Sequence, residues 1–235
     1  MRVLILVPAY NEENSIAATL ADLRAGDPGW DVLVVNDGSR DRTGAVCREL
    51  GCPVLDLPVN LGIGGCVQTG YRYALENGYD AAVQFDADGQ HMARYIPDLL
   101  APLARGEAQL VVGSRFLRPE GFRSTALRRA GIGFLSGLTA LLGGVRVRDI
   151  TSGMRAAGRE AIALFAREYA QDYPEPESVL SAGMEGLRVM EVPVEMRPRT
   201  GGRSSISPVR SVYYMVKVSL ALLLRRCFGR KRHAE

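Results

Sequence analysis

Short apolar runs alternate with helix-like segments through the first half of the chain. The apolar runs end at proline, asparagine or aspartate, which is typical of buried strands. The segments between them repeat apolar residues three and four positions apart on one face. The predicted strands are 3–7, 31–35, 53–57, 81–85 and 109–112, and the predicted helices are 16–23, 42–50, 64–76 and 94–103. This order predicts an α/β fold with a mostly parallel, Rossmann-like sheet that has helices on both faces.

The second half of the chain is less regular. It contains predicted helices at 127–142, 159–166, 176–185 and 207–224, and a predicted strand at 187–194. A chain of 235 residues is long enough for one well-buried domain with an appendage. We therefore expect a globular domain over 1–206, followed over 207–235 by an amphipathic helix and a basic tail.

Two carboxylates, Asp86 and Asp88, follow the predicted strand at 81–85. In extended chain they would point to opposite faces, so they can share a cation only if the strand ends and turns there. Gly89 allows that turn, and Gln90 adds a neutral oxygen to a set of ligands that suits Mg²⁺ or Mn²⁺. The alternative is a polar turn that only ends the strand. The neighbouring loops favour a cation held against a diphosphate.

Polar loops also follow the first two predicted strands, over 8–13 and 36–43. In a parallel sheet these loops meet Asp86 at the carboxyl edge, where ligands collect. The Asp37 carboxylate can accept a hydrogen bond from a nucleotide base, and the Tyr10 ring can cover the face of that base. Taken singly, Asp37 is also common in turns and Asn11 is also common at the start of a helix.

Six polar motifs follow one another along the chain. They are Val7-Pro8-Ala9-Tyr10-Asn11-Glu12, Asn36-Asp37-Gly38-Ser39-Arg40-Asp41, Asp86-Ala87-Asp88-Gly89-Gln90-His91, Gly113-Ser114-Arg115, Thr151-Ser152-Gly153-Met154-Arg155 and Glu191-Val192-Pro193. In this order they resemble the motifs of family 2 inverting glycosyltransferases with the GT-A fold. The resemblance is strongest to dolichyl- and undecaprenyl-phosphate sugar synthases, and it runs from residue 3 to about residue 206.

The resemblance implies a role for each matching residue. Asp86 and Asp88 would contact the diphosphate and Mg²⁺ or Mn²⁺, with Gln90 as a further metal ligand. Arg115, and as a second candidate Arg129, would grip an acceptor phosphate, because a planar guanidinium holds phosphate through two hydrogen bonds. The base and ribose pocket would be lined by Pro8, Tyr10, Glu12 and Asp37.

The chain departs from the family pattern in two places. Arg199 matches an arginine near the donor phosphates, but Ser205 stands where the family has a lysine, and Arg203 could supply the missing charge. The serine that these synthases often use at the acceptor phosphate is also absent, because Ile132 and Gly133 stand there. The donor side is therefore better defined by the sequence than the acceptor side.

The acceptor decides whether a catalytic base is needed. A lipid monophosphate has a second pKa of about 6, so it is mostly a dianion at neutral pH and can attack directly. A sugar hydroxyl would need a carboxylate base. Asp172, Glu175 and Glu177 are the candidates; we expect Glu177 to position substrate, and its action as a base stays open.

The predicted helix over 207–224 is apolar except for a stripe that contains Arg210, Lys217 and the following Arg225. Such a helix can lie in a membrane interface, with basic side chains reaching anionic head groups. An oligomer interface or a small membrane partner is the alternative. The net charge of +3 gives no reason to expect nucleic acid binding.

The leading interpretation is a metal-dependent, inverting glycosyltransferase. It would move a sugar from a UDP- or GDP-linked donor to a polyprenyl phosphate, for cell-surface glycan assembly. Four scattered cysteines and a strand that begins at residue 3 favour a cytoplasmic protein at the inner membrane face. Two alternatives stay open: transfer to a glycan hydroxyl with Glu177 as base, or a non-catalytic, membrane-associated nucleotide-binding scaffold.

Overall fold

The computed structural model describes residues 1–27, 29–117, 126–197 and 208–228, except for the side chains at 126–128 and 208–212. The strands are β1 (Val3–Ala9), β2 (Asp31–Asn36), β3 (Val54–Asp56), β4 (Ala81–Gln84), β5 (Leu110–Ser114), β6 (Arg155–Gly158) and β7 (Val189–Pro193). The α-helices are α1 (Ile16–Gly26), α2 (Thr43–Glu49), α3 (Gly62–Glu76), α4 (Ile96–Ala104), α5 (Ala126–Gly143), α6 (Arg159–Arg167), α7 (Pro174–Met184) and α8 (Pro208–Phe228). A short 3₁₀ turn over Ala93–Tyr95 precedes α4.

The described strands form one mixed sheet with the order β3-β2-β1-β4-β6-β5-β7. All neighbouring pairs are parallel except those of β6, which runs antiparallel to both β4 and β5. The predicted α/β class and mostly parallel sheet are confirmed. Strand β6 was not predicted from the sequence, because Ala156, Ala157 and Gly158 have low strand propensity.

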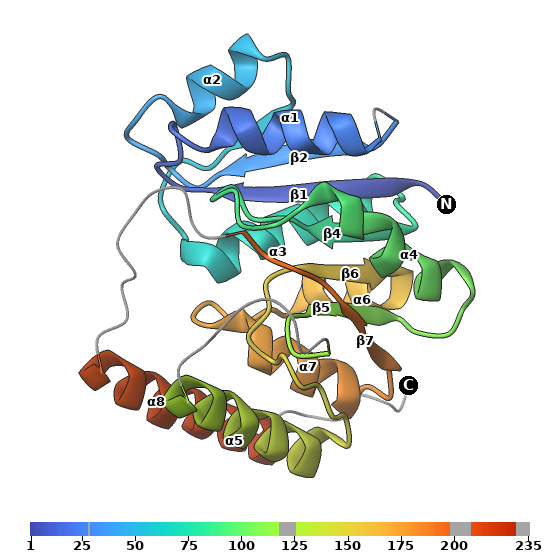
Figure 1. Ribbon diagram of the computed structural model, residues 1–235, viewed down its shortest axis with the longest axis vertical. Helices are drawn as coiled ribbons and strands as arrows, with labels where there is room; N and C mark the ends of the chain where they lie inside the picture. Colours follow the sequence, from blue (N-terminus) through green and yellow to red (C-terminus); the bar gives the residue numbers. More distant parts are fainter. Residues whose placement is uncertain (28, 118–125, 198–207, 229–235) are drawn as a thin grey trace.

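Alternate residues of β1 enter two apolar cores on opposite faces of the sheet (Figure 1). Leu4 and Leu6 pack with residues of α3 and α6, whereas Ile5 and Val7 pack with residues of α1 and α4. Burial of each such side chain contributes roughly 1.5–3 kcal/mol. The sheet is thereby held between two helical layers, and its strand ends are free to carry a site.

Helices α5, α7 and α8 form a further group on the α3 side of the sheet. Figure 1 shows α5 and α8 side by side at the bottom of the molecule, and Val218 and Leu222 of α8 are buried in the same core as Leu135 of α5. No helix in the described part of the chain combines the length and apolar character that a membrane crossing requires.

Candidate active site

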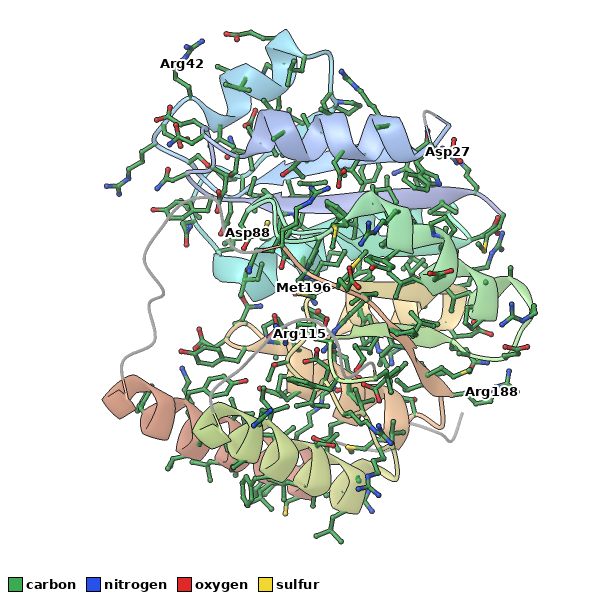
Figure 2. The ribbon with its side chains drawn as sticks, viewed as in Figure 1. Asp27, Arg42, Asp88, Arg115, Arg188 and Met196 are labelled. Carbon is green, nitrogen blue, oxygen red and sulfur yellow. The ribbon has the colours of Figure 1, made fainter. Side chains whose placement is uncertain are left out.

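The order of the strands places the candidate site at the carboxyl edge of the sheet. After β1 the chain adds β2 and β3 on one side and then crosses to add β4 on the other, so the order reverses between β1 and β4. Ligands of α/β sheets bind outside the strand ends at such a reversal. In Figure 2, Asp88 and Arg115 lie toward the side where β1 and β4 end, and Asp27 and Arg188 lie at the opposite side.

The loops after β1 and β2 are joined by hydrogen bonds. The backbone N–H of Asn11 donates to Ser39 Oγ (2.9 Å), and Asn11 Oδ1 accepts from the N–H of Arg40 (2.8 Å). Glu12 N–H donates to Thr43 Oγ1 (2.8 Å). Asn11 has a φ of 56°, a left-handed conformation that asparagine tolerates. Asn11 therefore joins the two loops, and the residue at the N-cap of α1 is Ser15.

Within these loops the predicted base-binding residues differ in exposure. Asp37 is buried, and its Oδ1 accepts a hydrogen bond from the N–H of Leu61 (2.7 Å). Among the described residues, no donor contacts Asp37 Oδ2. Pro8 is buried within β1, while Tyr10 is 45% exposed beyond the strand end. Glu12 Oε2 accepts from Ser15 Oγ (2.5 Å), so its carboxylate is already engaged at the start of α1.

The turn after β4 holds Asp86 and Asp88 in defined positions. Gly89 has the left-handed φ of 75° that the sequence led us to expect at this turn. Asp88 Oδ1 accepts from the N–H of Gln90 (3.0 Å), and Asp86 Oδ1 accepts from Gln84 Nε2 (3.1 Å). The Asp86 N–H donates to His91 Nδ1 (2.9 Å). The imidazole of His91 is buried and therefore stabilises the turn from the protein interior.

A second glycine closes the space beside Asp86. Gly153 precedes β6, and a Cβ atom added there would lie 2.7 Å from Asp86 Oδ2. Only glycine fits that close approach without displacing the carboxylate. The chain segment that leads into β6 thus forms one wall of the candidate site.

Asp86, Asp88 and Gln90 suit a divalent cation that also binds phosphate. Within the described ranges no group of three or more His, Cys, Asp or Glu side chains is arranged to hold a metal ion by itself. Mg²⁺ is commonly held by one or two carboxylates together with substrate phosphates, and this pair of aspartates fits that pattern. The predicted phosphate ligands Arg199 and Arg203 lie outside the described residues. The chain leading to them passes this turn, because the N–H of Arg197 donates to the carbonyl oxygen of Gln90 (2.8 Å).

Arg115, at the end of β5, is held by a buried aspartate. Its Nε and Nη2 donate to the two carboxylate oxygens of Asp149, each at 2.7 Å, and its backbone N–H donates to Oδ2 at 2.9 Å. Glu191 of β7 accepts from the backbone N–H groups of Arg148 (2.8 Å) and Asp149 (2.9 Å). Glu191 and Asp149 therefore set the orientation of the Arg115 guanidinium. Arg129, the second predicted phosphate ligand, is exposed on the first turn of α5.

The three candidate acids of the α7 region differ in their surroundings. Burial raises the pKa of Glu175, Arg155 opposes the rise, and the negative charge of Asp86 adds to it. Burial also raises the pKa of Glu177, but there the next influences are Arg225 of α8 and Asp172. Asp172 is exposed and pairs with Lys217 of α8. The negative charge of Asp86 thus contributes to the raised pKa of Glu175, whereas Arg225 of α8 and Asp172 influence the pKa of Glu177.

The chain is similar to known proteins over most of its length. The family model described as "Glycosyl transferase family 2" matches residues 4–165. "UDP-N-acetylglucosamine--dolichyl-phosphate N-acetylglucosaminyltransferase" of Methanococcus voltae is 32% identical over 214 residues, covering 82% of this chain and 84% of the relative. "Undecaprenyl-phosphate mannosyltransferase" of Micrococcus luteus is 35% identical over 216 residues, covering 88% of each chain.

A solved structure has the same fold. Glucosyl-3-phosphoglycerate synthase from Mycobacterium tuberculosis, in complex with Mg²⁺ and uridine diphosphate, superposes with a TM-score of 0.72 and 24% sequence identity. The match covers 96% of this chain and 79% of that one. The sheet and its flanking helices are therefore the GT-A arrangement.

Proposed function

Because the chain belongs to glycosyltransferase family 2, we propose that it transfers one sugar from a nucleotide-diphosphate donor to a polyprenyl phosphate. The relatives named above, which are more than 30% identical over most of the chain, are named for transfer to dolichyl or undecaprenyl phosphate. The observation that carries the donor half of the proposal is the carboxylate turn after β4, which lies beside the joined loops after β1 and β2.

The donor would be held through its base and its diphosphate. Asp37 binds the base, and Tyr10 covers it. Asp86, Asp88 and Gln90 would hold Mg²⁺ or Mn²⁺ beside the diphosphate. The chemistry supplied by that cation is stabilisation of the negative charge that builds on the departing nucleotide diphosphate. Arg199 and Arg203 would add positive charge on the same side.

The acceptor phosphate would be bound by Arg115. A phosphate oxygen forms the new bond to the anomeric carbon, while the bond from that carbon to the diphosphate breaks and its electron pair leaves with the diphosphate. A single displacement of this kind inverts the anomeric centre. No proton has to be removed, because the phosphate is already ionised at neutral pH. Arg115 is suited to the task because Asp149 fixes its guanidinium before the acceptor arrives.

We further propose that α5 and α8 rest on the membrane that contains the lipid acceptor. Two basic residues of the predicted stripe are paired with acids: Lys217 with Asp172 (2.6 Å) and Arg225 with Glu168 (3.0 Å). The third, Arg210, has its side chain outside the described residues. Apolar side chains are exposed along the same helix, and we call them the apolar stripe: Tyr213, Val216, Leu220, Leu223, Leu224 and Phe228. Phe134 and Leu141 of α5 are also exposed, at 57% and 81%.

Such a surface would be unfavourable in water and fits the acyl boundary of a membrane. Residues 1–206 would then be the transferase domain, and 207–235 would contribute the membrane contact. The unpaired cysteines, three of them buried, suit the reducing side of that membrane. A second copy of the chain on the apolar stripe is the competing explanation.

A second acceptor class is favoured by one observation, the position of Glu175. Burial raises the pKa of its carboxyl, as expected of a base that removes a proton from a sugar hydroxyl. Glu175 would take this role in place of Glu177. With a hydroxyl acceptor, Glu175→Gln abolishes turnover while donor binding survives; with a phosphate acceptor, the loss is modest.

The proposal is tested by incubating the protein with undecaprenyl phosphate in vesicles, Mg²⁺ and a panel of labelled UDP- and GDP-sugars. A lipid-linked sugar from at least one donor is expected, with loss of the product in Asp88→Asn. Absence of lipid-linked product from every donor would contradict the proposal. A non-catalytic scaffold would bind nucleotide without any effect of the metal, which calorimetry distinguishes.

A further inference from the structure

The largest fully buried side chain among the described residues is a cation, Arg155. It lies in β6 between Gln84 of β4 and Val112 of β5. A guanidinium that is withdrawn from water costs several kcal/mol unless its donors are satisfied, and an apolar side chain of similar volume often serves stability better. A buried cation next to a candidate active site therefore calls for a functional explanation.

The partners of Arg155 come from two different segments. Its Nε and Nη2 donate to the carbonyl oxygens of Ser152 (2.7 Å) and Ile150 (3.1 Å), in the turn before β6. Its Nη1 donates to the carbonyl oxygen of Glu175 (2.8 Å) and to Ser178 Oγ (2.5 Å), in the first turns of α7. All four acceptors are uncharged, and within the described residues no carboxylate forms an ion pair with Arg155. The guanidinium thus ties the turn at 150–152 to the start of α7.

Both segments that Arg155 joins, the turn at 150–152 and the start of α7, carry or adjoin groups of the candidate site. Asp149, next to the tied turn, orients Arg115, and Gly153, on its other side, lies against Asp86. On α7, the carbonyl that accepts from Arg155 belongs to Glu175, one of the candidate acids. One guanidinium therefore connects the arginine proposed for the acceptor with the carboxylates proposed for the donor.

We propose that Arg155 is a positioning residue of the transfer reaction. It fixes the separation between the acceptor held at Arg115 and the donor held at Asp86, and it does so without touching either substrate. The inference rests on the proposed function, because it takes Arg115 and Asp86 as the two ends of the reaction. A small change in that separation alters the rate of transfer strongly, since an error of about 1 Å in reacting geometry costs on the order of 100-fold.

The test compares, in Arg155→Lys and Arg155→Met, how much sugar is transferred to the acceptor and how much is released to water by hydrolysis of the donor. When acceptor and donor are mispositioned, more of the sugar goes to water and less to the acceptor. We expect the ratio of transfer to donor hydrolysis to fall roughly tenfold or more in Arg155→Met and less in Arg155→Lys. Metal-dependent binding of the nucleotide diphosphate, measured by calorimetry, is expected to stay within about twofold. The ratio is independent of how much protein is folded, so a loss of stability alone cannot change it.

Arg159→Lys is the matched control, because Arg159 follows the same strand, is exposed and pairs with Asp80. Its ratio is expected to equal that of the wild type. Arg155 variants that keep the wild-type ratio, with or without lower stability, would overturn the proposal. The ratio is measured with whichever acceptor the wild type uses, so transfer to a hydroxyl would refute the proposed acceptor without deciding the role of Arg155.

A readout that needs no turnover accompanies the ratio. Hydrogen exchange of backbone amides is expected to become faster both at 149–153 and at 174–178 in Arg155→Met, because both segments lose their hydrogen bonds to the Arg155 guanidinium. A rise in only one of them would contradict the connection.

Discussion

Gly153→Ala tests how closely the site is fitted around Asp86. The added Cβ would lie 2.7 Å from Asp86 Oδ2 and 3.3 Å from Gln84 Nε2, whereas ordinary contact begins at 3.4 Å. The Asp86 carboxylate must therefore move by about 0.7 Å, the gap between 2.7 and 3.4 Å. Since an error of about 1 Å in an active site costs on the order of 100-fold, we expect kcat/KM to fall by roughly 10- to 100-fold.

The stability of Gly153→Ala should not fall together with its activity. The backbone at Gly153 lies outside the left-handed region, so alanine is compatible with it. Replacing glycine at such a position stabilises a protein by about 0.4–1 kcal/mol, because the unfolded chain loses freedom. Part of that gain is lost to the displaced carboxylate, so the melting temperature is expected to stay near that of the wild type while activity falls.

The assay measures kcat, the KM for donor, metal-dependent nucleotide binding and thermal unfolding on the same preparations. Gly158→Ala is the matched control at the far end of β6, where the added Cβ meets only ordinary contacts, the nearest at 3.5 Å. Wild-type kcat/KM in Gly153→Ala, or a loss of activity that follows a loss of stability, would refute the reasoning.

Three further perturbations test other parts of the site. Asp149→Asn removes the charge opposite the buried Arg115 and is expected to raise the KM for acceptor with little change in the KM for donor; denaturant unfolding should show a loss of up to roughly 3–5 kcal/mol. Glu175→Gln should melt above the wild type at pH 7. Burial raises the pKa of Glu175 above 4.5, so the neutral form stabilises the fold only at low pH, and the difference should disappear as pH falls through 4.5. Leu220→Glu should weaken binding to anionic vesicles at least roughly tenfold, whereas the same change at Leu75, an exposed residue of α3, should not; equal binding of both variants would rule out the apolar stripe as the membrane contact.

The meeting of the loops proposed to bind the donor could be predicted from the sequence, because these loops follow strands with strong apolar patterns. The strand before Asp86 and the strands before Tyr10 and Asp37 are parallel neighbours, as expected, so their loops meet at one edge. Strand β6 could not be predicted in the same way. Arg155 interrupts its apolar pattern. The segment becomes a strand because it pairs with β4 on one side and with β5 on the other.

The acceptor half depended on details that the sequence does not contain. Helix α7 begins at Pro174, two residues before the predicted start. Two residues correspond to about 200° around a helix, so Glu175 and Glu177 project in nearly opposite directions. The ion pairs of Lys217 and Arg225 in α8 could not be predicted from the sequence either. The acids that pair with Lys217 and Arg225 lie on distant segments, and only the fold brings them together.

The central claim is that the nucleophile is a phosphate oxygen. It is tested most directly by offering the protein undecaprenyl phosphate, or undecaprenol in its place, in identical vesicles with Mg²⁺ and the preferred donor. We expect a labelled lipid with the phosphate only, and a rate that falls as pH drops through about 6, where the phosphate gains a proton. Transfer to undecaprenol at a comparable rate would contradict it.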